Sequence, residues 1–141
     1  MKQKWIVVAE SSRARIFAVD SKNQPLIEID DLVNPASRVQ NHDLVADRPG
    51  RHSRGSSQHA LEPHSDPQKL QAQRFAQSLS DRLEAGRVGG DFNDLVIVAP
   101  SGFMGLLRQQ IGHTTQKHIS HTLTKNLIQK SEAQIRDYIY T

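Results

Sequence analysis

Three stretches of the sequence carry side chains that could bind or transform another molecule, and the first covers residues 49–61. It reads PGRHSRGSSQHAL and follows one further arginine; the residues able to contact a phosphate are Arg48, Arg51, Arg54, Gly55 and Gln58. Arginine holds phosphate oxygens through two parallel N–H donors, and glycine lets a backbone approach another molecule closely. This stretch therefore predicts a loop that reaches into an RNA-lined site. A polar loop without ordered structure is the equally simple alternative.

The second stretch is the turn Pro100-Ser101-Gly102, which follows the uncharged run LVIVA of residues 95–99. Because LVIVA is too short and too rich in Val and Ile for a helix, it predicts a buried strand, and the apolar spacing after the turn predicts a helix. Backbone N–H groups at the start of such a helix bind anions. Ser101 and Gly102 are therefore candidates for phosphate contact, although Ser101 has the simpler role of helix N-cap. The turn is no G-x-S-x-G elbow, which argues against a serine hydrolase.

The third stretch is a long run without acidic residues between Asp94 and Glu132. It contains four cationic side chains, Arg108 and Lys117 among them, and three histidines. Residues 48–61 form a second acid-free run, although the whole chain has a formal charge of only +3. Two basic patches on a nearly neutral protein predict a directed anionic partner, for which RNA or phosphate is the usual candidate. A basic surface that merely faces solvent is the alternative.

The histidines do not predict a metal site. Zinc needs three or four ligands that converge in space, and His118 and His121 point to opposite faces if residues 117–123 form a strand. The chain has no cysteine, which excludes disulfides and thiolate ligands, and its carboxylates show no paired arrangement typical of a hydrolase. We therefore expect no metal, no cofactor and no firm catalytic residue. These features favour a binding protein over an enzyme.

The remaining periodicities predict the elements that hold these candidates. Residues 4–9 and 13–19 are β-rich runs that predict a hairpin, and residues 26–33 add a third antiparallel strand. Arg13 and Arg15 share a face of the second strand, where they could meet an anion or equally pair with acids of the neighbouring strand.

A helical period returns at Asp66. Asp66 suits the N-cap and Pro67 the first helical position, while Gly86 and Gly89-Gly90 are expected to end the helix. Further along, the pattern of KHISHTL predicts a final strand with Ile119 and Leu123 inside, and residues 131–140 predict a closing helix.

Together these elements predict a single α/β domain covering residues 1–141. Its mixed sheet has about five strands, begins with an antiparallel meander and carries helices on both faces. Residues 34–67 interrupt it with a long loop that has little to bury and that we expect to be mobile in isolation. No stretch is long enough for a membrane span, and the apolar patch near the N-terminus is too short for a signal-peptide core. We therefore expect a cytoplasmic protein.

Several motifs occur in the order found in a known bacterial family. WIVVAESSRARIF near the start, LVNP before the loop, an RF-containing helix and then FNDLVIVAPSGFMGLLR resemble the host attachment proteins, "protein required for attachment to host cells". The resemblance covers nearly the whole chain and is most specific over residues 5–17 and 95–108. That family in turn looks like the middle domain of archaeo-eukaryotic peptide-chain release factors and their bacterial relatives.

The release-factor resemblance implies a role for the loop. In that domain a β-meander precedes a long loop carrying Gly-Gly-Gln, which enters the ribosomal peptidyl-transferase centre and helps water attack peptidyl-tRNA. By resemblance, Gly55 and Gln58 are the positions that correspond to it. Here Ser56-Ser57 precede Gln58, so the backbone freedom of the second glycine is missing, and this departure argues against hydrolysis.

Three functions follow. The best supported is a non-catalytic RNA- or ribosome-associated binding module, because of the basic loop and the acid-free run. The second is an interaction protein required, directly or indirectly, for attachment to host cells through an unknown host-cell or protein partner. The third is hydrolysis of peptidyl-tRNA esters with Gln58 positioning the water. The oligomeric state does not follow from these patterns.

Overall fold

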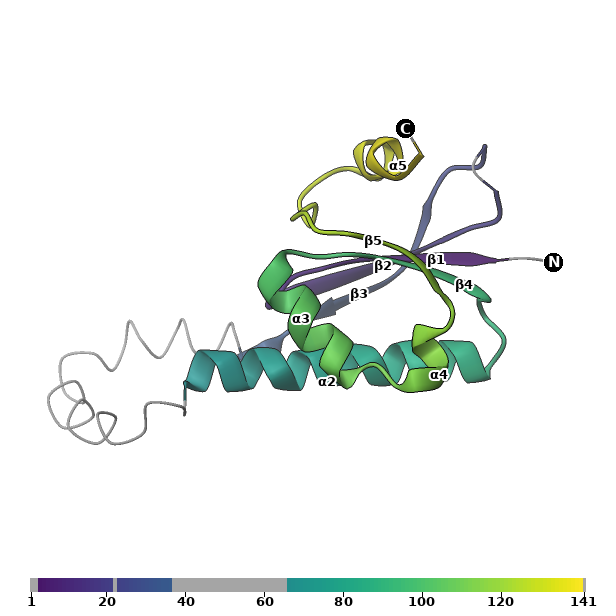
Figure 1. Ribbon diagram of the computed structural model, residues 1–141. Coiled ribbons are helices and arrows are strands. Elements are labelled where there is room, and N and C mark those ends of the chain that lie inside the picture. The colour runs from purple at the N-terminus through teal and green to yellow at the C-terminus, as the bar shows by residue number, and fades with distance from the viewer. Residues whose placement is uncertain (1–2, 22, 37–65, 141) are drawn as a thin grey trace, which may run out of the picture.

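The chain folds around a five-stranded mixed sheet, as the sequence predicts (Figure 1). The structure, a computed structural model, describes residues 3–21, 23–36 and 66–140. In chain order the strands are β1 (Lys4–Ala9), β2 (Arg13–Val19), β3 (Ile27–Val33), β4 (Asp94–Val98) and β5 (Ile119–Leu123). The spatial order is β3-β2-β1-β4-β5, so β3 and β5 form the two edges.

The first three strands form the predicted antiparallel meander, and β4 and β5 extend the sheet in parallel on the other side of β1. Residues 95–98 of β4 are each at most 1% exposed. A strand with one solvent-exposed face would alternate between polar and apolar residues. The uncharged LVIVA run therefore correctly indicated that both faces of the sheet are covered.

Helices cover both faces of the sheet (Figure 1). One face carries α2 (Pro67–Val88), α3 (Ser101–Gln110) and the single-turn α4 (His113–Gln116), and the other carries α5 (Glu132–Tyr140). α2 begins as predicted, because the Asp66 side chain accepts a hydrogen bond from the Gln68 N–H and Pro67 opens the helix. α2 lies beside α3, and the rings of Phe75 and Phe103 are 6.0 Å apart.

Gly86 does not end α2, so that part of the prediction is wrong. The helix continues to Val88, and Gly89 is its C-cap. The reason lies in packing: a Cβ at Gly86 would stand 2.6 Å from Cη2 of Trp5, so the glycine lets the helix approach the indole closely. Gly90, with a φ of 76°, completes the turn after the helix, as the double glycine indicated.

β5 contains a bulge that the sequence analysis did not predict. The register with β4 shifts between Leu95 and Val96, so that Ser120 is an extra residue. Ile119 therefore packs against the core under α2, whereas Leu123 packs against the core under α5. Both side chains are partly buried against a core, as predicted, but on opposite faces of the sheet, because one inserted residue reverses the faces of the residues that follow.

The expected loop of residues 34–67 falls largely outside the described residues, and its order stays a prediction. At its start Asn34 is 5% exposed, and its Nδ2 donates to the carbonyl of Ser11 at 3.0 Å. The Ala36 N–H donates to the Asn34 side chain at 3.1 Å, so the exit from β3 is held in place. In the part of the chain that the structure describes, no helix is both long and apolar enough to cross a membrane.

Candidate functional site

An open groove runs along the outer side of β5, where no further described strand pairs with the sheet. It has a volume of about 530 Å³ and is lined by Arg108, Gln116, Ile119, Ser120, His121 and Thr122. The lining comes from the last turn of α3, from α4 and from four consecutive residues of β5. Because an edge strand also presents backbone N–H and C=O groups outward, the groove offers main-chain as well as side-chain hydrogen-bonding groups.

Arg108 is held in this groove by its neighbours. Its Nη2 donates to Thr122 Oγ1 at 3.2 Å, which occupies one of the five N–H donors of the guanidinium. The Gln116 Nε2 donates to the carbonyls of Arg108 (3.1 Å) and Ile111 (2.9 Å), and Ser80 Oγ donates to the carbonyl of Gln110 (3.0 Å). These bonds satisfy carbonyls at the end of α3, where a cation is also favoured by the helix dipole.

A buried polar cluster anchors α4, which carries Gln116. Thr115 is 1% exposed; its Oγ1 donates to Glu84 Oε1 at 2.9 Å and accepts from Arg87 Nε at 3.0 Å. Arg87 Nη2 also reaches Glu84 Oε2 at 3.0 Å. The side chains of α2 therefore fix the position of α4, and with it one wall of the groove.

The four cations of the acid-free run have no acidic partner among the described residues. Arg108, Lys117, Lys125 and Lys130 form no ion pair there, because the acid-free run builds α3, α4, β5 and the segment before α5. Lys125 instead lies 5.7 Å from the ring centroid of Tyr138. Of these, Arg108 lines the groove and Lys117 lies just before β5, so both are cations of the β5 edge.

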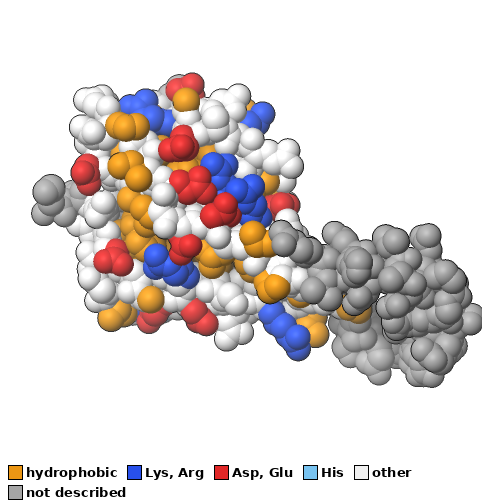
Figure 2. All heavy atoms as spheres, turned by 180° about the vertical axis from the view of Figure 1, so that it is seen from behind, with side chains coloured by type: hydrophobic (Ala, Val, Ile, Leu, Met, Phe, Trp, Pro, Cys, Tyr) orange, Lys and Arg blue, Asp and Glu red, His pale blue; other side chains and the backbone are white. Residues whose placement is uncertain are grey.

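The opposite edge carries arginines that are all paired with acids of β3. The pairs are Arg13 with Asp31 (2.7 Å), Arg15 with Glu28 (3.0 Å) and Arg82 with Asp30 (2.8 Å). The hydrogen bond from Arg13 lowers the pKa of Asp31, and the same bond raises the pKa of the Arg13 guanidinium. Figure 2, which views the molecule from behind, shows basic and acidic side chains lying side by side. Of the two roles open to Arg13 and Arg15, the structure shows ion pairing.

Ser101 and Gly102 lie at the carboxyl end of β4, where α3 begins, but Ser101 is not the N-cap. Pro100 holds that position with extended backbone angles, and no side chain caps the helix, so Ser101 is already the first helical residue. Both Ser101 and Gly102 are exposed. Seven residues separate Ser101 from Arg108, about 10 Å along the helix, so these two candidates do not line the groove.

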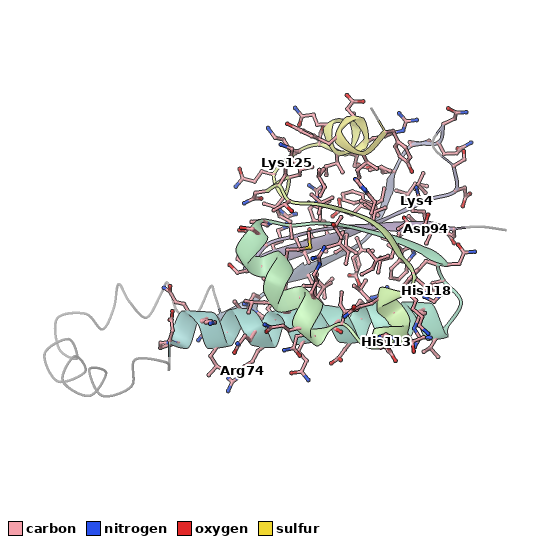
Figure 3. All side chains as sticks on the ribbon, viewed as in Figure 1. Lys4, Arg74, Asp94, His113, His118 and Lys125 are labelled. Atoms are coloured by element: carbon pink, nitrogen blue, oxygen red, sulfur yellow. The ribbon has the colours of Figure 1, made fainter. Side chains whose placement is uncertain are left out.

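The remaining described candidates surround the groove without forming a metal site. Lys117 is exposed at the end of α4, and His121 lines the groove from β5. His118 precedes β5; its Nδ1 lies 3.1 Å from the Thr114 carbonyl, and its ring meets Phe92 edge-on. Figure 3 shows His113 and His118 beside α4, away from Lys125. Among the described residues no three His, Asp or Glu side chains gather where they could hold a metal ion.

The loop candidates Arg48, Arg51, Arg54, Gly55 and Gln58 lie outside the described residues. Conversely, sequence reasoning missed Gln116, Ser120 and Thr122. Each lies within the acid-free run, which is the one signal that pointed to this part of the chain. Nothing in their local spacing indicates that they meet Arg108, because that contact depends on how β5 pairs with β4.

A family model described as "Protein required for attachment to host cells" matches residues 5–139, which include all the described strands and helices apart from Lys4 and Tyr140 at the ends of β1 and α5. The chain belongs to this family. The match confirms the host attachment resemblance of the sequence motifs. Among curated proteins, no sequence shows a significant match.

Two solved structures were compared with this chain by fold, both at low sequence identity. An archaeal translation termination factor has a TM-score of 0.51 at 10% identity, over 96% of this chain and 37% of that chain. A structure titled "Archaeal protein" has a TM-score of 0.48 at 10% identity, over 98% of this chain and 36% of the other. The chain thus spans little more than a third of either structure. At this identity the first likeness shows a release-factor-like fold and nothing further, and the second carries no argument.

Proposed function

We propose that this host attachment family protein is a non-catalytic module that binds RNA, free or within the ribosome, along the β5 edge. The observation that carries the proposal is the contrast between the two edges of the sheet. Arg13, Arg15 and Arg82 are paired with acids at the β3 edge, whereas Arg108 and Lys117 at the β5 edge have no acidic partner among the described residues.

The shape and chemistry of the groove suit a polymer of phosphates. The groove is open along β5, and its lining is mostly polar. Arg108 retains donors beyond the one used on Thr122, and the hydroxyls of Ser120 and Thr122 add further hydrogen-bonding groups. Binding of such cations to phosphates releases counterions from the nucleic acid, which is the main driving force of sequence-independent association.

The fold likeness to an archaeal translation termination factor is the reason why this proposal names RNA among the possible anions. The loop cations Arg48, Arg51 and Arg54 would extend the same surface, and this part of the proposal rests on the sequence alone. An RNA partner also implies that the protein acts in the cytoplasm.

The test is binding of the purified protein to fluorescent RNA, and its sedimentation with ribosomes, at a series of salt concentrations. Arg108→Ala and Lys117→Ala remove cations from the β5 edge, so each should weaken binding at low salt. Each should also reduce the slope of log K against log salt by roughly 0.7 to 0.9 for every phosphate that the variant no longer binds.

Arg13→Ala is the matched control, because it removes one exposed positive charge at the paired edge. It should leave the salt slope unchanged. If the protein binds neither RNA nor ribosomes at any salt concentration, the proposal is wrong. If Arg13→Ala and Arg108→Ala change the affinity and the salt slope equally, binding depends only on net charge, and the β5 edge is not a specific binding site.

The family description favours a second function, an interaction required directly or indirectly for attachment to host cells. It predicts that antibodies against the protein label intact cells and reduce adhesion, whereas the RNA proposal predicts that the protein stays inaccessible on intact cells. Ester hydrolysis through Gln58 remains a sequence prediction on a residue outside the described part, and loss of ester cleavage in Gln58→Ala would support it.

A further inference from the structure

Among the Phe, Trp and Tyr rings of the described chain one is exposed, and it lies near Lys125. Tyr138 on α5 is 45% exposed, whereas five other rings are at most 5% exposed, those of Trp5, Phe17, Phe75, Phe92 and Phe103. Tyr140 is half-buried, and its ring lies 5.1 Å from Lys4 Nζ and 5.7 Å from the Arg136 guanidinium. Tyr138 is therefore the ring whose surface is open to a ligand.

A series of contacts connects this ring to the groove. Arg108 donates to Thr122, the next residue Leu123 accepts from the Lys125 N–H at 3.1 Å, and the Lys125 ammonium lies 5.7 Å from the Tyr138 ring. Figure 3 shows Lys125 between the end of β5 and α5. These contacts lead from the groove through the end of β5 to Lys125 and the Tyr138 ring.

The helix that carries Tyr138 is held firmly. Ser131 and Gln134 form a reciprocal capping box, in which the Ser131 N–H donates to Gln134 Oε1 (2.9 Å) and the Gln134 N–H to Ser131 Oγ (3.2 Å). Ile135 is fully buried against the sheet. Arg15 donates to the carbonyls of Ile128 and Lys130, which fixes the segment between β5 and α5. Because these contacts hold α5 in place, the Tyr138 ring is presented in a fixed position where a planar group can stack on it.

We propose that the β5 edge binds single-stranded RNA, with one base stacked on Tyr138 and adjacent phosphates held by Lys125 and Arg108. The inference rests on the proposed function and names its ligand. An aromatic ring offers a flat apolar face that suits any base, and a lysine beside it supplies the charge for the phosphate. In a duplex the bases stack on each other and their faces are covered, so a duplex uses the cations but not the ring. Base stacking on the ring is consequently specific to single strands.

The test compares a labelled single-stranded oligouridine with a fully paired, blunt-ended RNA duplex that carries the same number of phosphates, by fluorescence anisotropy with the full chain. Tyr138→Ala should weaken binding of the single strand by roughly tenfold or more, as loss of base stacking does, and leave duplex binding unchanged. Tyr138→Phe keeps the ring and should bind as the unsubstituted protein does. Val88→Ala is the matched control, because Val88 is an exposed apolar residue, 69% exposed, at the far end of α2.

Thermal unfolding of all variants shows whether each remains folded. If Tyr138→Ala does not remain folded, Tyr138→Phe still tests whether the ring without its hydroxyl is sufficient for binding of the single strand. If Tyr138→Ala binds the single strand as tightly as the unsubstituted protein does, or weakens duplex binding to the same extent, the inference is wrong. A salt-sensitive effect of Arg108→Ala in the same experiments would still support the proposed function. Absence of binding to both RNAs overturns both. A tenfold loss of affinity for the single strand in Tyr138→Ala, without such a loss in Val88→Ala, supports base stacking on Tyr138.

Discussion

Two glycines inside helices have opposite surroundings. A Cβ at Gly86 in α2 would lie 2.6 and 2.8 Å from atoms of the Trp5 indole and 3.1 Å from Phe92 Cε2, so there is no room for one. A Cβ at Gly105 in α3 would meet nothing within 4 Å. The first glycine is required by packing, whereas the second only weakens its helix.

We predict that Gly86→Ala lowers the free energy of unfolding by about 1–3 kcal/mol, because overpacking against the indole outweighs the better helix propensity of alanine. Gly105→Ala should raise the same free energy by about 0.5–1 kcal/mol, since the unfolded chain loses freedom and no clash arises. Urea unfolding of the two variants measures both. Stabilisation by both substitutions would show that the packing against Trp5 is not tight.

The ion pair of Asp31 predicts a small pH dependence of stability. Its pKa is lowered in the folded protein, chiefly by the hydrogen bond from Arg13. A lowered pKa stabilises the fold at pH values above the unfolded pKa of about 3.9, and this contribution is lost as pH falls through the folded pKa. Both side chains are 40% exposed, so solvent screens the pair.

The difference in unfolding free energy between unsubstituted protein and Asp31→Asn should be about 0.2–1 kcal/mol at pH 7. It should shrink as pH falls below about 4. Denaturant unfolding at several pH values measures it. A difference that stays constant down to about pH 2 would mean that charge at Asp31 is not its cause.

At the scale of elements, α4 has a single turn and depends on its anchor to α2. Thr115, 1% exposed, joins Glu84 and Arg87 through the two hydrogen bonds of its hydroxyl. An isolated turn of helix is not stable in water, so tertiary contacts must hold it. Gln116 and Lys117 follow directly, and their positions depend on this anchor.

Thr115→Val keeps the shape of the side chain and removes both hydrogen bonds, so we predict a loss of about 1–2 kcal/mol in the free energy of unfolding. Thr114→Val is the control, because Thr114 is exposed on the same turn, and it should change stability by less than about 0.5 kcal/mol. Chemical denaturation compares them. An equal loss in the two variants would show that the buried hydroxyl contributes nothing particular.

At the scale of the whole molecule, the sheet separates its charges between its two edges. The β3 edge holds carboxylates matched by arginines, while the β5 edge holds cations without described acidic partners. The formal charge of +3 therefore understates the local field that a polyanion meets at β5. This asymmetry is why the salt slope, rather than affinity at one salt concentration, is the informative measurement.

Local patterns predicted most of the architecture. The uncharged run of residues 95–98 became a fully buried strand, Asp66 caps α2, and the meander follows the period-2 pattern. Packing overrides local preference at Gly86, which continues a helix because Trp5 lies against it. At the start of α3, Pro100 rather than Ser101 is the N-cap, and no side chain caps the helix. α4 had no expected counterpart, because four residues are too few for a helical period to show.

The amino-acid sequence by itself determined which segments form the five strands and the three longer helices, where acidic residues are missing, and which family the chain resembles. Those properties are local or compositional, and neighbouring residues suffice to express them. Only the tertiary structure decided that Arg13 and Arg15 are paired with acids while Arg108 has no acidic partner among the described residues, and that Arg108, Gln116 and Thr122 share one groove. Such contacts join residues far apart in the chain, and a single bulge at Ser120 is enough to change which of them meet.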